Sequence, residues 1–184
     1  YLVASSLILT GLVQLAFTRF ISDRLFEKKR ELVLPNLHGL LLIVILAASL
    51  LGSVLLFIVL PGLGVVYRLL MLAGFVIMCA VWILTVLLSG MKRYQAIVLL
   101  FAGAYALIVG LTLALRPLGL EGLLGGFVFG NLVLLCGMWL LTVRDFADPG
   151  PFLRFDFLRP ELAYPTLMAI GCLYNLAVWA DKFM

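Results

Sequence analysis

The residues best suited to chemistry in this sequence lie in one short stretch, residues 174–182. Asn175 and Lys182 are seven residues apart, so a helix places them on one face, and Tyr174 and Asp181 share the adjacent face. A charge at the centre of a bilayer costs roughly 2.5–3.5 kcal/mol on insertion scales. The stretch therefore either lines a hydrophilic path through a membrane or lies at the outer end of a helix and reaches the headgroups.

A second polar face lies on the first apolar segment, at four-residue steps: Ser6, Thr10, Gln14 and Thr18. Such a face should point at other helices or at a water-filled path rather than at lipid. Arg19 follows near the end of that segment. Two other apolar segments carry Arg68 and Asn131, and Arg68 joins the path if it does not snorkel outward. The candidate substrate path consists of Gln14, Arg19, Arg68, Asn131, Asn175, Asp181 and Lys182.

Residues for catalysis or metal binding are not evident. The three cysteines fall inside apolar runs and match no zinc or redox spacing, and His38 has no partner at metal-ligand spacing. The sequence offers no nucleophile with a base, no clustered carboxylates and no phosphate-binding glycine loop. We therefore predict neither an enzyme nor a catalytic residue, metal site or cofactor.

Two apolar segments carry small residues at four-residue spacing, which lets helix backbones approach closely in a membrane. One set is Gly122, Gly126 and Gly130, with Gly125 adjacent, and the other is Ala102, Ala106, Gly110 and Ala114. The pattern predicts that both sets pack against neighbouring helices.

The elements that must position these residues follow from composition. Hydrophobic residues make up 65% of the chain and charged residues only 12%, well outside the range of soluble domains. A membrane helix needs about 20 mostly apolar residues. Six segments qualify: 1–20, 37–60, 65–88, 96–115, 121–143 and 163–184. The predicted fold is an all-α, polytopic helical bundle with six transmembrane helices.

The distribution of Lys and Arg predicts the orientation of these helices. The loops after the first, third and fifth segments are basic, and the loops on the other side hold only Arg68 and Arg116. The basic loops are therefore expected in the cytoplasm, and the net charge of +4 does not indicate nucleic acid. Arg19 and Asp23, like Arg24 and Lys28, lie four residues apart, which suggests that the first helix extends into water.

The longest basic loop, between the fifth and sixth segments, begins with the turn signal 148–151 and continues with alternating aromatic and charged residues. We expect it to lie in the headgroup layer with its basic residues toward anionic lipid. A docking site for a cytoplasmic partner is the alternative. The predicted division is residues 1–143 as an N-terminal bundle, 144–162 as a cytoplasmic or interfacial linker and 163–184 as the first helix of a C-terminal bundle.

Residues 16–29, 89–94 and 174–182 resemble the PelG family of Pel exopolysaccharide transporters, which is similar to flippases of the multidrug/oligosaccharidyl-lipid/polysaccharide (MOP) superfamily. The resemblance implies about twelve helices in two pseudo-symmetric bundles. This chain would then lack the family's first helix and end in the seventh. It also implies a cytoplasmic (inner) membrane location, a polysaccharide substrate, and a cytoplasmic glycosyltransferase and membrane-anchored Pel subunits as partners, besides membrane lipid.

The leading hypothesis from the sequence is therefore transport of the Pel polymer across the cytoplasmic membrane within a synthase–transport complex. Export of lipid-linked oligosaccharides or of small cations is the alternative within the same superfamily. A membrane scaffold that anchors the polysaccharide synthase without transporting anything is the alternative from another class.

Overall fold

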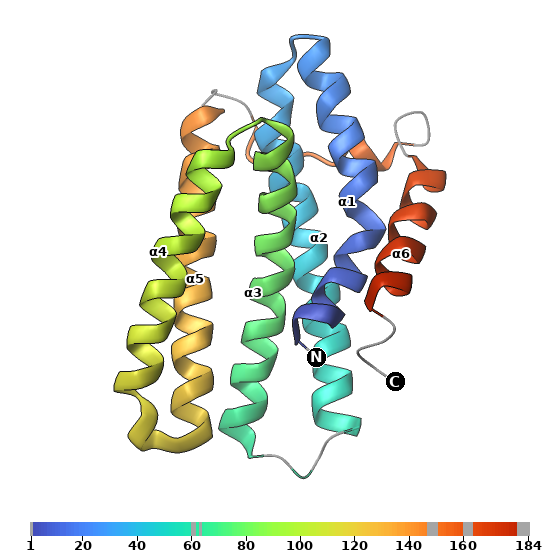
Figure 1. Ribbon diagram of the computed structural model, residues 1–184. Coiled ribbons are helices and arrows are strands. Elements are labelled where there is room, and N and C mark those ends of the chain that lie inside the picture. The colour runs from blue at the N-terminus through green and yellow to red at the C-terminus, as the bar shows by residue number, and fades with distance from the viewer. Residues whose placement is uncertain (1, 60–61, 63, 147–150, 160–163, 180–184) are drawn as a thin grey trace.

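The computed structural model shows an all-helical bundle over the part of the chain that it describes, residues 2–59, 62, 64–146, 151–159 and 164–179 (Figure 1). The six longer helices are α1 (Leu2–Phe26), α2 (Val33–Val54), α3 (Val65–Gly90), α4 (Tyr94–Ala114), α5 (Gly119–Asp145) and α6 (Pro165–Trp179). The short helical turns are η1 (Arg30–Leu32), η2 (Leu55–Val59), η3 (Arg116–Leu118) and η4 (Asp156–Leu158).

Five of these helical stretches are long and apolar enough to cross a membrane: Leu2–Phe26, Arg30–Ile58, Val65–Gly90, Tyr94–Ala114 and Arg116–Asp145. The predicted all-α membrane fold is therefore confirmed. The described part of the sixth helix, α6, has 15 residues, and the rest of the predicted segment 163–184 lies outside the described residues. The twelve-helix, two-bundle arrangement stays a prediction.

The first helix is longer than its apolar segment, as the spacing of its charges suggested. It continues to Phe26, and in its last two turns Arg19 pairs with Asp23 at 3.2 Å. Arg24 pairs with Glu27 at 2.9 Å rather than with Lys28, which has the same charge and follows the helix end with φ 61°. The apolar pattern predicts only the part of α1 that lipid can surround. The ion-paired turn that follows continues the helix into water.

The helices are arranged around α3, which packs against α1, α2 and α5. As Figure 1 shows, α6 lies on the outer side of α1 and runs opposite to it, and α4 covers α5 at the other side of the bundle. The buried core fills the space among α1, α2, α3 and α5 with leucine, valine, isoleucine and phenylalanine side chains. Van der Waals packing of this kind holds membrane helices together, because lipid tails are as apolar as leucine.

The glycine set on α5 packs against α4, as predicted. A Cβ added at Gly126 would lie 2.9 Å from the backbone nitrogen of Thr112, whereas one at Gly125 would meet nothing within 4 Å. The prediction for the small residues of α4 is wrong, because the set that includes Gly110 is exposed. The face of α4 that meets α5 instead carries Ile108 and Thr112, which fill the space that the α5 glycines leave.

Candidate functional site

The polar face of α1 is buried against α3. Ser6 and Thr10 are both 0% exposed. The indole nitrogen of Trp82 donates a hydrogen bond to the Ser6 hydroxyl at 3.1 Å, and the Gln14 amide donates to the Thr10 hydroxyl at 2.9 Å. Both hydrogen bonds satisfy costly polar groups inside the bundle, and the one from Trp82 joins α3 to α1.

The contact between α1 and α6 depends on two glycines. A Cβ added at Gly11 would lie 2.5 Å from the Asn175 amide nitrogen and 2.9 Å from the Gly171 carbonyl oxygen. A Cβ at Gly171 would clash with the Gly11 carbonyl oxygen. The Asn175 amide donates to the Gly171 carbonyl at 3.1 Å. Asn175 therefore lies against α1, the helix that also carries Gln14.

Three other candidate path residues, Arg19, Arg68 and Asn131, lie apart from this crossing. Arg19 is 60% exposed in its ion pair with Asp23, and Asn131 on α5 is buried, where its amide donates to a carbonyl of its own helix. Arg68 lies near the start of α3 with its guanidinium 4.9 Å from the centre of the Phe57 ring. Asp181 and Lys182 lie outside the described residues.

Residues 151–159, which we call the strap, run across the bundle between α5 and α6 (Figure 1). Asn36 of α2 is 0% exposed and holds the strap at Asp156: its side-chain oxygen accepts the Asp156 N–H at 2.8 Å, and its amide donates to the Asp156 carboxylate at 3.2 Å. The backbone N–H of Arg154 donates to the Pro35 carbonyl at 3.0 Å. The Phe157 ring meets the Phe17 ring edge-on at 5.6 Å.

His38 joins the strap to α5. The Trp139 indole donates to His38 Nε2 at 3.2 Å, so Nε2 carries no proton and the neutral ring holds its proton on Nδ1. That nitrogen then donates to the Phe152 carbonyl oxygen at 3.1 Å. Neither this role of His38 nor that of Asn36 was predicted from the sequence. Both residues stand at the start of an apolar run, which is the one signal that marks them.

Tyr164, which precedes α6, donates a hydrogen bond to the Asp23 carboxylate at 2.6 Å. This hydrogen bond, with smaller contributions from desolvation and from the Asp23 charge, raises the pKa of the Tyr164 hydroxyl. A raised folded-state pKa adds stability below the pKa of the unfolded chain, about 10, and that stability is lost as the pH rises further.

We expect Tyr164→Phe to lower the melting temperature of the full-length protein in neutral detergent at pH 8. The deficit should shrink as the pH rises through the raised pKa of Tyr164, because the wild-type phenol then loses the proton that it donates. Thermal scans between pH 8 and 11 check this, with Tyr94→Phe as control, since Tyr94 is exposed on α4. A constant deficit across this pH range would contradict the assignment.

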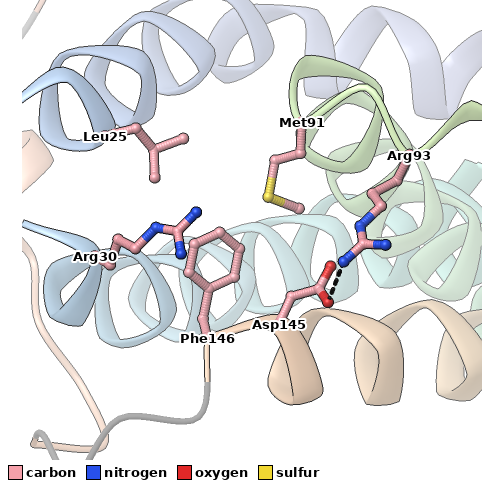
Figure 2. A pocket seen from close by; sticks show the side chains of 6 residues that line it. All are labelled: Leu25, Arg30, Met91, Arg93, Asp145 and Phe146. Atoms are coloured by element: carbon pink, nitrogen blue, oxygen red, sulfur yellow. Dashed lines mark hydrogen bonds and ion pairs between the residues drawn. The ribbon is translucent and has the colours of Figure 1, made fainter. Parts of the chain in front are cut away.

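A pocket of about 260 Å³ opens where the basic turns meet. It is lined by Leu25, Arg30, Met91, Arg93, Asp145 and Phe146. Figure 2 shows that the Arg30 guanidinium points into it toward Phe146, while Arg93 pairs with Asp145 at 2.8 Å. Over the described residues, no group of three or more His, Cys, Asp or Glu side chains is placed to hold a metal ion.

Comparison with known protein families gave one match. The family model PelG, described as "Putative exopolysaccharide Exporter (EPS-E)", matches residues 1–184. Searches of curated proteins and of solved structures gave no match. The match covers the same chain whose described part forms a bundle of membrane-length helices.

Proposed function

Since the chain belongs to the PelG family of exopolysaccharide exporters over residues 1–184, we propose that it is the transporter subunit that moves the Pel polymer across the cytoplasmic membrane. In this proposal it works within a complex that contains a cytoplasmic glycosyltransferase and membrane-anchored Pel subunits. The family match over the whole chain is the observation that carries the proposal. The protein supplies a path and no catalytic step.

The distribution of charge in the structure supports a defined orientation. The basic side chains gather at the end of the bundle that holds the α1–α2 turn, the α3–α4 turn and the strap: Arg19, Arg24, Lys28, Lys29, Arg30, Lys92, Arg93, Arg144, Arg154 and Arg159. Arg68 and Arg116 lie toward the opposite end. By the positive-inside rule we place the basic end in the cytoplasm, where the polymer is made.

We place the path along α6 and the face of α1 that meets it. Asn175 brings an amide group to this helix pair, and Gln14 brings another to the adjoining polar face of α1. Amides exchange hydrogen bonds with sugar hydroxyls without carrying a charge into the membrane. On a continued helix Lys182 would share the face of Asn175, and Asp181 would lie on the adjacent face. An acidic residue there would attract a polymer that carries amino groups.

Replacing Asp181 and Lys182 together with alanine in the full-length protein tests the path. We expect secreted polymer to fall at least about tenfold while the complex still assembles, because loss of the charged groups proposed to contact the polymer raises the transport barrier by at least about 1.4 kcal/mol. Secreted polymer is measured by immunoblot of culture medium, and assembly by co-purification of the partner subunits.

The matched control is Arg116→Ala with Glu121→Ala, which removes one cation and one carboxylate from exposed positions at the end opposite the basic turns. Secretion should stay at the wild-type level in this control. Unchanged secretion in the Asp181 and Lys182 variant would place these side chains at the headgroups. Loss of assembly would assign them a structural role and favour a scaffold.

A further inference from the structure

The pocket at the basic end has an unbalanced charge. Arg93 forms an ion pair with Asp145 at 2.8 Å. The Glu27 carboxylate pairs with both Arg24 and Lys29, each at 2.9 Å. Among the described residues Arg30 takes part in no ion pair, although its guanidinium points into the pocket (Figure 2). A guanidinium with five fixed donors is suited to a carboxylate or phosphate oxygen.

The rest of the pocket wall is apolar. Leu25, Met91 and Phe146 surround the space in front of Arg30, and Phe146 is only 7% exposed. Phe26, which follows Leu25 at the end of α1, is 90% exposed, the largest exposure among the large hydrophobic side chains that the structure describes. An unpaired cation beside a concave apolar wall and a projecting aromatic ring is typical of a surface that receives another protein.

Size and position distinguish between the possible occupants. A volume of about 260 Å³ is below the roughly 300–1,000 Å³ of ordinary small-molecule sites, and it suits one or two side chains rather than a sugar polymer. In Figure 1 the α1–α2 turn rises beyond the α3–α4 turn, so the wall that carries Arg30 extends past the ends of the neighbouring helices. That position favours a partner in water over a lipid in the bilayer.

We propose that this pocket binds an acidic peptide segment of a partner protein. A carboxylate of the segment pairs with Arg30, and an adjacent apolar side chain enters the space among Leu25, Met91 and Phe146. The exposed ring of Phe26 packs against the same segment. The inference deepens the proposed function and rests on it for the side of the membrane, since the basic end faces the compartment where the synthase works.

Binding can be measured with the full-length protein in nanodiscs of phosphatidylcholine, which carry no net charge. The probe is a short fluorescent peptide that combines Asp and Glu with one Leu and one Phe, and its counterpart has Lys in place of each acidic residue. Fluorescence anisotropy should show that wild-type protein prefers the acidic peptide. Arg30→Glu should weaken that binding at least about tenfold and strengthen binding of the Lys peptide, because the charge in the pocket is reversed.

The matched control is Lys28→Glu, which makes the same charge change on the same turn at an exposed residue that does not line the pocket. It should alter binding by no more than about threefold, since the charge at Lys28 lies outside the pocket and reaches the peptide only through salt-screened solvent. The gain of Lys-peptide binding by Arg30→Glu also shows that this variant is folded. Equal losses of acidic-peptide binding in both variants would show only a general attraction between the basic end and the peptide, and would overturn the proposal.

Two further outcomes would also overturn it. Wild-type protein that binds neither peptide has no such site. The third comparison is between nanodiscs that contain phosphatidylglycerol and nanodiscs of phosphatidylcholine at the same chloride concentration. If the peptide is displaced from wild-type protein only in the first, lipid is the occupant. The binding assay involves no export, so the two proposals fail separately. Absent peptide binding together with the expected loss of secretion in the Asp181 and Lys182 variant would leave the proposed function standing. Peptide binding together with unchanged secretion in that variant would leave the pocket standing.

Discussion

Gly171→Leu is expected to separate α6 from α1 and to abolish polymer secretion by the full-length protein. Even a Cβ at this position clashes with the Gly11 carbonyl oxygen and lies 3.4 Å from the Leu15 side chain. The obstacle includes helix backbone, so no rotamer change can relieve it. Overpacking of this kind costs about 3 kcal/mol, or more when the backbone must move.

The measurement is equilibrium unfolding of the purified full-length protein in detergent micelles, together with secreted polymer in cells. Gly103→Leu is the matched control, because a Cβ at Gly103 on α4 meets nothing within 4 Å. That change should be neutral or slightly stabilising, since leucine favours helix over glycine by up to about 1 kcal/mol. A Gly171→Leu protein as stable and as active as the Gly103→Leu protein would show that α1 and α6 do not pack through these glycines.

Asn36→Leu is expected to release the strap from α2. Leucine has nearly the same size, but it leaves the backbone N–H of Asp156 and one carboxylate oxygen without their partner on α2. Loss of hydrogen bonds to a charged group in a buried position costs about 2–3 kcal/mol. A cost of this size raises the fraction of molecules with a released strap by about 30-fold or more.

Limited trypsin digestion of the full-length protein in detergent detects this release, because the strap contains Arg154, whose bond to Phe155 trypsin can cut. Cleavage after Arg154 should accelerate in Asn36→Leu in proportion to the released fraction. The control is Asn131→Leu, which also removes a buried asparagine, but one whose side-chain amide donates to a carbonyl within α5. If Asn36→Leu and wild-type protein are cut at the same rate, the hydrogen bonds to Asp156 do not hold the strap.

The helix ends and helix partners show where sequence reasoning succeeds and where it does not. The apolar spans were predictable because the cost of placing a side chain in hydrocarbon adds up locally along the chain. The continuation of α1 to Phe26 was partly predictable from the spacing of Arg19 and Asp23, which form the expected ion pair. The packing face of α4 was not predictable from its own residues. Small residues on α5 leave space that larger side chains fill, so Ile108 and Thr112 occupy the contact and Gly110 is exposed.

By itself, the sequence determined that this is an all-helical membrane protein, which end of the bundle is basic and which family it resembles, because hydropathy, charge and motif are properties of short stretches. Only the tertiary structure decided that Asn36 and His38 hold the strap, that Gly11 receives Asn175, and that Arg30 faces an apolar pocket. The physical reason is that a polar side chain in a bundle finds its partner across space. His38 and Phe152, 114 positions apart along the chain, meet through a hydrogen bond and through their rings, whose centres are 4.5 Å apart.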